Sequence, residues 1–247
     1  MPASQSLVDL ARQPVVLPSM LLCDFGNLER EVRALEQAGF AGLHLDVMDG
    51  VFVPNFSYGL TIVRAFRGLT SLPLDVHLMM VNPQQYVAAF RQAGADLISF
   101  HAEAVEDVQS VVQTIRENGA LAGVALNPQT PVDRIESAVD ELDYVVLMTV
   151  QAGFGGQAFQ SGPLAKIEAL RRRREDLWIE VDGGINRGTI RACCAAGANG
   201  LVVGSAIFGE DDYGQAHEEL RAEIRAGWKG VPRSGAEAEL ASDRPAN

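Results

Sequence analysis

The chain has 247 residues, a hydrophobic fraction of 47%, an aromatic fraction of 6% and a formal net charge of −12. Its length suits either two small domains or one (β/α)8 barrel, since such barrels reach about 250 residues as a single domain. The acidic balance argues against nucleic acid and anionic membranes as partners, because both require clustered Lys and Arg to neutralise phosphate.

Cellular location follows from the same inventory. No stretch approaches the roughly 20 apolar residues of a membrane span, and residues 1–14 lack the apolar segment of an export signal. The cysteines include the adjacent Cys193 and Cys194, whose spacing does not suit an ordinary disulfide. We therefore expect a cytoplasmic protein without a membrane segment.

Short apolar runs alternate with amphipathic stretches along the chain. The short runs predict strands over residues 15–21, 43–48, 72–80, 96–102, 121–127, 143–150, 177–182 and 200–205. The amphipathic stretches predict helices over residues 28–39, 58–69, 83–94, 105–119, 132–142, 164–175, 187–197 and 214–227. Several helices end on a glycine suited to a left-handed cap: Gly39, Gly94, Gly119 and Gly197.

Eight strand–helix units favour a closed parallel (β/α)8 TIM barrel in a single domain, since no unit can bury its apolar strand alone. An open doubly wound sheet would usually carry GxGxxG after its first strand, and residues 19–26 contain none. We assign the barrel to residues 13–226, with residues 1–12 and 227–247 as flexible, aperiodic extensions. The basic run from residue 171 to 174 ends a predicted helix, where cations complement the dipole, and a phosphate patch is the alternative.

Polar side chains occupy strand positions that should be apolar. Alternate residues of a strand share one face, and barrel enzymes place their catalytic groups at the carboxyl ends of the strands. Three predicted strands then present these residues inward: His44, Asp46 and Met48; Asp75, His77 and Met79; Trp178, Glu180 and Asp182. We expect His44, Asp46, His77 and Asp182 to converge at the mouth of the barrel.

Two imidazoles and two carboxylates suit one divalent transition metal such as Zn, Fe, Mn or Co. A buried ionised group without a partner costs several kcal/mol, so a bound cation explains why a barrel interior accepts these side chains. The alternative, for each residue taken singly, is a hydrogen-bonded core histidine or a turn-capping aspartate. We expect Asp75 and Glu180 to support the metal-bound groups, and His101 to have a structural or supporting role.

Glycine-rich turns follow three neighbouring predicted strands: Gly153, Phe154, Gly155 and Gly156 after the sixth, Gly183 and Gly184 after the seventh, Gly204 and Ser205 after the eighth. Backbone N–H groups in such turns can hold an anion without a lysine. The loops after strands seven and eight are the usual phosphate site of barrel enzymes. An acidic chain can therefore bind a phosphorylated ligand.

The sequence resembles the ribulose-phosphate 3-epimerase family over about residues 15–224. The matching phrases are PSML with DF (18–25), HLDVMDGVFVPN (44–55), DVHLM (75–79), VALNPQTP (124–131), MTVQAGFGGQAF (148–159), EVDGGIN (180–186) and VGSAIF (203–208). The resemblance implies a ribulose-phosphate-binding barrel and an isomerase of the pentose-phosphate pathway. It implies interconversion of D-ribulose 5-phosphate and D-xylulose 5-phosphate with one divalent metal ion, by a homo-oligomer.

The same motifs imply residue roles. The metal ligands would be His44, Asp46, His77 and Asp182, with Asp46 and Asp182 also the acid/base pair. Ser19, His77 and the three glycine-rich turns would contact substrate, and Met48, Met79 and Met148 would line the pocket. Inverting a carbinol carbon beside a ketone needs a base on one face and an acid on the other, through an enediolate that a metal can stabilise.

The sequence departs from the family pattern around the substrate. Leu22 and Cys23 stand where Ser-Ala is usual, Val51 where a polar residue is common, and Gln151 and Ala152 where Asn-Pro or Glu-Pro is usual. Allulose 6-phosphate or a tetrulose phosphate is thus an alternative substrate. A non-catalytic phosphosugar-binding barrel is a further alternative. The metal-free barrels of histidine and tryptophan biosynthesis share the glycine cradle but would not need this His and Asp set.

Overall fold

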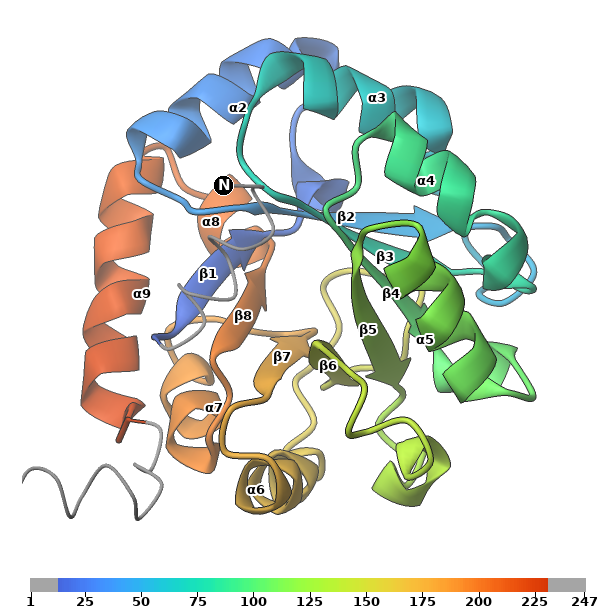
Figure 1. Cartoon of the computed structure of the whole chain (residues 1–247). Coiled ribbons are helices and arrows are strands. Elements are labelled where there is room, and N and C mark those ends of the chain that lie inside the picture. The colour runs from blue at the N-terminus through green and yellow to red at the C-terminus, as the bar shows by residue number, and fades with distance from the viewer. Residues whose placement is uncertain (1–12, 231–247) are drawn as a thin grey trace, which may run out of the picture.

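Eight parallel strands form a nearly closed ring in the computed structural model, which describes residues 13–230 (Figure 1). The strands are β1 (Val15–Pro18), β2 (Leu43–Met48), β3 (Leu74–Met79), β4 (Leu97–His101), β5 (Leu121–Leu126), β6 (Tyr144–Met148), β7 (Trp178–Asp182) and β8 (Gly200–Val203). They pair in the order β1-β8-β7-β6-β5-β4-β3-β2, and an isolated parallel bridge between Ser19 and His44 joins the two ends. The predicted barrel is confirmed.

Helices surround the ring on its outer side (Figure 1). They are α2 (Leu28–Gln37), α3 (Leu60–Leu69), α4 (Val87–Ala93), α5 (Val108–Glu117), α6 (Leu164–Arg173), α7 (Ile190–Ala196), α8 (Ser205–Phe208) and α9 (Tyr213–Gly227). Short 3-10 turns lie in the loops: η1 (Met20–Leu22), η2 (Phe25–Asn27), η3 (Pro83–Gln85), η4 (Ala102–Ala104) and η5 (Val132–Ile135).

The connection between β5 and β6 differs from the prediction. The sequence predicts a helix over residues 132–142, whereas only η5 forms and turns follow it. Asp140 and Glu141 would place negative charge in the last turn of such a helix, where the dipole disfavours it. Arg134 instead donates to a carbonyl of η4 at 3.2 Å. The period of apolar residues predicts a helix here because it takes no account of charges at the helix end or of contacts with other segments.

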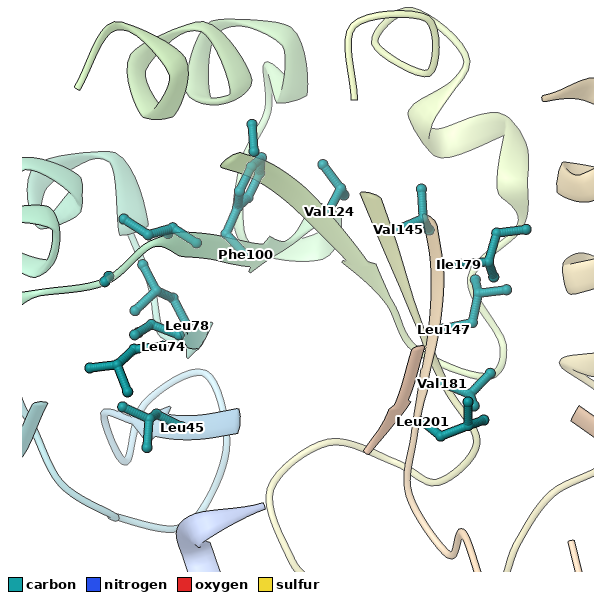
Figure 2. Packing of buried hydrophobic residues seen from close by; sticks show 14 of the residues in the cluster. Leu45, Leu74, Leu78, Phe100, Val124, Val145, Leu147, Ile179, Val181 and Leu201 are labelled. Carbon is teal, nitrogen blue, oxygen red and sulfur yellow. The ribbon is translucent and has the colours of Figure 1, made fainter. Parts of the chain in front are cut away.

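Apolar side chains pack on both sides of the strands. Those facing outward meet the helices, among them Leu45, Leu74, Leu78, Phe100, Val124, Val145, Leu147, Ile179, Val181 and Leu201 (Figure 2). Those facing inward fill the barrel, among them Leu17, Leu97, Tyr144, Val146 and Trp178. Burying one large apolar side chain stabilises the fold by about 1.5–3 kcal/mol. The two layers confirm the predicted alternation of side chains along the strands. The polar inward-facing positions lie toward the carboxyl ends of the strands.

Glycines end four helices in the left-handed conformation, as predicted. They are Gly39 (φ 80°) after α2, Gly94 (φ 118°) after α4, Gly119 (φ 77°) after α5 and Gly197 (φ 112°) after α7. The buried Arg171 of α6 packs on Gly197, where a Cβ would lie 2.9 Å from the Arg171 Cγ. Its guanidinium donates to the Gly197 carbonyl at 2.9 Å and to Asn199 Oδ1 at 3.0 Å. The basic run therefore supplies a buried link to the segment before β8 as well as charge at a helix end.

The predicted extensions fall mostly outside the described residues, which exclude 1–12 and 231–247. Gly227, which the sequence places in the C-terminal extension, is the last residue of α9. Trp228 packs partly buried against the core. Across residues 13–230, no helix combines the length and the apolar character needed to cross a membrane.

Candidate metal centre

Four polar side chains meet at the carboxyl ends of three strands. His44 and Asp46 come from β2, His77 from β3 and Asp182 from the end of β7. The strand register sets Asp46 beside His77. One nitrogen or oxygen atom from each of the four lies within 4.8 Å of the others. The structure therefore brings together the set of residues that the sequence singles out.

The distances within the cluster match those between ligands of a single ion. His44 Nε2 lies 3.4 Å from Asp46 Oδ1. His77 Nδ1 lies 3.7 Å from Asp46 Oδ1 and 3.7 Å from Asp182 Oδ2. Two ligands bonded about 2.1 Å from a tetrahedral ion lie about 3.4 Å apart. A small rearrangement would thus place all four atoms around one cation.

Two buried nitrogens in the cluster have no hydrogen-bond partner among residues 13–230: His44 Nε2 and His77 Nδ1. Both imidazoles are fully buried, so an unpaired nitrogen there is costly. The other nitrogen of each ring is engaged: His44 Nδ1 lies 2.6 Å from Asp75 Oδ2, and His77 Nε2 lies 3.0 Å from His101 Nε2. Each ring therefore has one nitrogen free for a cation, and the mixed nitrogen and oxygen set fits Zn, Fe, Mn or Co.

Positive charge is stabilised in this cluster. Burial lowers the pKa of His44, but the charges of Asp46 and Asp75 raise it by more, so the pKa lies well above its ordinary value. Burial likewise lowers the pKa of His77, whereas its contacts with Asp182 and Asp46 raise it to about 9. Burial raises the pKa of Asp46, and the two histidines lower it to below its ordinary range. The two carboxylates thus favour a proton or a metal cation beside them.

A second acidic layer lies beneath the cluster. His44 Nδ1 is 2.6 Å from Asp75 Oδ2 and 3.2 Å from Glu180 Oε1. Tyr144 donates its hydroxyl to Asp75 Oδ1 at 2.8 Å. Burial, followed by the charge of Asp75, raises the pKa of Glu180 to about 8. The raised pKa of Glu180 favours its protonated form, and Asp75 accepts the hydrogen bond that fixes the His44 ring.

A cavity of about 260 Å³ opens above the cluster. Its walls include the residues predicted to contact substrate or line the pocket: Ser19, Met48, Met79, Met148, Gly153, Phe154, Gly155, Gly156, Gly183, Gly184, Gly204 and Ser205. Asp46 and Asp182 reach the cavity, whereas the fully buried His77 is not among its lining residues. Ser19 Oγ donates to Asp46 Oδ2 at 2.7 Å. The carboxylates are thus the cluster members that face a ligand.

The glycine turns let backbone approach the cavity closely. Gly183 has a φ of 111°, and a Cβ there would lie 2.4 Å from Val150 Cγ2. Gly184 has a φ of 68°, and a Cβ there would lie 3.0 Å from the backbone of Phe159. No Lys or Arg of the described chain lines the cavity. An anion bound here would be held by backbone N–H groups and by neutral donors such as Ser205 and Asn186.

Three of the family departures fall on the cavity: Leu22, Gln151 and Ala152. A Cβ at Gly204 would lie 2.9 Å from a Leu22 methyl, so the Leu22 side chain fills space beside the predicted phosphate turn. Cys23 is buried in the outer core, and Val51 is 72% exposed on the loop after β2.

Sequence reasoning missed several residues around Asp46. Its backbone N–H donates to the hydroxyl of Tyr58 at 3.0 Å, and its carbonyl accepts from Ser57. Gln157 and Asn186 also line the cavity. The phrase EVDGGIN already contained Asn186, whereas Ser57 lies in a loop that gave no signal. Tyr58 begins the predicted helix 58–69, but α3 starts only at Leu60, so Tyr58 lies in the loop before it.

Together the fold and the site define a (β/α)8-barrel enzyme in which two carboxylates and two imidazoles form a candidate metal centre beneath a glycine-lined cavity. The sequence profile of the Ribulose-phosphate 3 epimerase family matches residues 15–208, and the chain belongs to this family. It is accordingly an epimerase, in the isomerase class.

Relatives in other organisms match most of the chain. The "Ribulose-phosphate 3-epimerase" of Bacillus subtilis (strain 168) is 49% identical over 211 residues, which are 83% of this chain and 97% of the relative. The "Ribulose-5-phosphate-3-epimerase, chloroplastic" of Arabidopsis thaliana is 45% identical over 217 residues, 85% of this chain and 77% of the relative. The Escherichia coli (strain K12) "Ribulose-phosphate 3-epimerase" is 41% identical over 219 residues, 86% of this chain and 97% of the relative.

Solved structures of low identity share the fold. The crystal structure of KGPDC from Streptococcus mutans in a ligand complex has a TM-score of 0.66 at 16% identity and covers 87% of this chain and 99% of that chain. A 3-hexulose-6-phosphate synthase has a TM-score of 0.65 at 20% identity and covers 85% of this chain and 99% of that chain. At these identities the likeness shows the barrel alone.

Proposed function

We propose that the chain is a metal-dependent ketose-phosphate 3-epimerase that interconverts D-ribulose 5-phosphate and D-xylulose 5-phosphate. The observation that carries this proposal is the placement of Asp46 and Asp182 in one cavity, on β2 and β7 of the ring. The names of the relatives support the substrate.

Two carboxylates from different strands can serve the two faces of one sugar carbon. One of Asp46 and Asp182 removes the proton at C3, and the other returns a proton to the opposite face. Asp46 Oδ2 accepts the Ser19 hydroxyl at 2.7 Å, which orients that carboxylate. Reversal of the two roles gives the reverse reaction, so the same pair serves both epimers.

His44, Asp46, His77 and Asp182 would hold the metal ion, since their facing atoms fit one cation. When bound, it would stabilise the negative charge that develops on the substrate oxygens as the C3 proton leaves. The methionines Met48, Met79 and Met148 line the cavity and keep its lower wall apolar. They favour a site with little water around the exchanging proton.

The glycine turns after β6, β7 and β8 would hold the substrate phosphate through backbone N–H groups. The cavity of about 260 Å³ lies between these turns and the acid pair. A substrate bound in this way would have its phosphate at one side of the cavity and its reacting carbon near Asp46 and Asp182.

A sister epimerase acting on allulose 6-phosphate or a tetrulose phosphate is the second candidate. Leu22 supports it, because its side chain packs beside Gly204 and Gly155, where it changes the wall that a phosphate or sugar chain would contact.

A panel of four-, five- and six-carbon ketose phosphates, assayed with and without a chelator, tests the proposal. We expect the highest kcat/KM with ribulose 5-phosphate, loss of turnover with chelator, and deuterium incorporation at C3 in heavy water. Higher kcat/KM on another ketose phosphate would support the sister activity. Binding without C3 exchange would indicate a non-catalytic barrel and contradict both.

We also propose that the chain acts in the cytoplasm as a homo-oligomer. Val51 and Phe56 on the loop after β2 are 72% and 76% exposed, and they flank a groove that Tyr58, Leu60 and Tyr86 also line. Exposed apolar patches of this kind favour association. Sedimentation velocity should give a mass above the 26.5 kDa of one chain, and a purely monomeric species would contradict this.

A further inference from the structure

We propose that Glu103 and His101 are positioning residues that keep Nδ1 of His77 free for the metal ion and that also anchor the phosphate loop. The inference deepens the proposed function and rests on it, because it assumes that His77 is a metal ligand. Its basis is a continuous chain of hydrogen bonds that leads from His77 through β4 to the loops after β5 and β6.

The series of hydrogen bonds begins with two buried imidazoles. His77 Nε2 lies 3.0 Å from His101 Nε2, and both rings are fully buried. His101 Nδ1 lies 3.2 Å from Glu103 Oε2, and the Glu103 side chain is 24% exposed. A short contact between two imidazole nitrogens requires that one carry a proton and the other present a lone pair. The positions of the protons are therefore linked along the chain.

Glu103 determines which atoms donate and which accept in this series of hydrogen bonds. Its other oxygen, Oε1, accepts the backbone N–H of Asn127 at 2.8 Å and the hydroxyl of Thr130. A carboxylate surrounded by donors acts as an acceptor at both oxygens. His101 must then carry its proton on Nδ1 and leave Nε2 as a lone pair.

The proton position on His77 follows from that on His101. Because His101 Nε2 is an acceptor, His77 must donate to it from Nε2, so Nδ1 is the nitrogen that gives up its proton when a metal ion binds. This Nδ1 is the atom that lacks a partner among residues 13–230 and lies 3.7 Å from both Asp46 Oδ1 and Asp182 Oδ2. Glu103, which does not touch the cluster, thus selects the nitrogen that His77 offers to the metal ion.

The same carboxylate reaches the phosphate loop. Asn127, held through its backbone N–H by Glu103, accepts the N–H of Ala152 on its side-chain oxygen at 3.1 Å. Ala152 directly precedes the Gly153–Gly156 turn. Lys166 fixes the same segment by donating to the Asn127 carbonyl at 3.0 Å. Glu103 therefore ties a metal ligand and the start of the phosphate turn to one anchor.

The Asn127 amide is a second neighbour of His101 Nδ1. Its oxygen accepts from Ala152, so its NH2 group faces His101, where Nδ2 lies 3.4 Å from Nδ1. This NH2 group could donate only to the opposite tautomer of His101. The shorter contact of 3.2 Å with the charged Glu103 carboxylate favours a proton on Nδ1, because hydrogen bonds to an ionised acceptor are the stronger ones.

Nitrogen NMR of the zinc-loaded protein labelled with 15N-histidine reads these protons directly. We expect a proton on Nδ1 and none on Nε2 of His101, and a proton on Nε2 of His77 with zinc on Nδ1. The opposite tautomer of His101 would overturn the inference without affecting the proposed function. Absence of any zinc effect on His44 and His77 would instead overturn the metal-dependent function.

The variant Glu103→Gln tests the anchor, with Glu106→Gln as a matched control at an exposed position of the same segment. The amide can donate to His101 Nδ1, which reverses both tautomers and puts the His77 proton on the metal side. We expect zinc affinity, measured by chelator competition, to fall about 10–100-fold, and KM for the ketose phosphate to rise. The control should match the wild type.

A role confined to stability predicts another outcome. Glu103→Gln would then unfold at a lower temperature while zinc affinity, KM and the histidine tautomers stayed at wild-type values, and this result would overturn the inference. Because the tautomers are read in the unmodified protein, the test remains decisive even if the variant fails to fold.

Discussion

Asp46 and Asp182 have different surroundings, although both face the cavity. The Asp46 side chain is 6% exposed and accepts the Ser19 hydroxyl, whereas the Asp182 side chain is 14% exposed. A pair of acids with different contacts suits a reaction in which each face of the substrate receives its own proton donor. The roles of these two residues are therefore separable by mutation.

Replacing either acid by its amide should stop epimerisation while leaving the fold intact. We expect Asp46→Asn and Asp182→Asn each to lower kcat by at least about 10²–10⁴-fold, the usual contribution of a positioned acid or base. Asp176→Asn, at an exposed position just before β7, is the control. Metal content and circular dichroism are measured in parallel. Near-normal turnover in either cavity variant would show that the two-carboxylate mechanism is wrong.

Single residues could be placed from the sequence where strand geometry decides which way a side chain points. Period-two alternation and the position of strand ends suffice to place His44, Asp46, His77 and Asp182 together, because a strand leaves two choices for each side chain. Ser57, whose position is set by a loop, could not be found in this way. The contact between Glu103 and Asn127 also depends on loops that meet only after the barrel closes.

At the scale of elements, the strands were easier to predict than the helices. A buried strand needs a short apolar run, whereas a helix also depends on its ends and on charges along its length. The segment 132–142 shows the difference: its amphipathic pattern predicts a helix, and its acidic end and the contact of Arg134 with η4 leave a 3-10 turn.

Packing of α9 against α2 includes a buried histidine. His217 of α9 is 7% exposed, stacks on Phe40 at 4.1 Å and donates from Nδ1 to the Ala38 carbonyl at 2.9 Å. Burial lowers its pKa below the ordinary value, the carbonyl contact opposes this, and Arg221 lowers it further. The folded state therefore favours the neutral ring.

This histidine should make stability depend on pH. Between its folded pKa and the unfolded value of about 6.5 the unfolded chain binds more protons, so the free energy of unfolding falls as the pH drops through that window. We expect the stability advantage of the wild type over His217→Gln, from urea titrations, to be larger at pH 7.5 than at pH 5. The subtraction removes groups common to both proteins. An advantage that is constant or grows in acid would contradict the assigned shift.

For the whole molecule, the barrel interior holds an unusual amount of negative charge. Asp46, Asp75, Glu180 and Asp182 lie around two histidines, and burial of unpaired charge is costly. A proton on Glu180, which its raised pKa favours, and a cation among the candidate ligands would each lower that cost. The same chain has a net charge of −12, whereas the proposed phosphate site in its cavity would use N–H groups of the glycine turns. The net charge therefore indicates which macromolecules can bind the protein surface. It does not indicate the charge of a ligand bound inside the barrel.

Anomalous diffraction from crystals of the zinc-loaded protein tests the central claim most directly. We expect one strong peak in the barrel, about 2.0–2.3 Å from His44 Nε2, His77 Nδ1 and one oxygen each of Asp46 and Asp182. An active preparation in which these four groups point apart, with zinc bound elsewhere or not at all, would contradict the account.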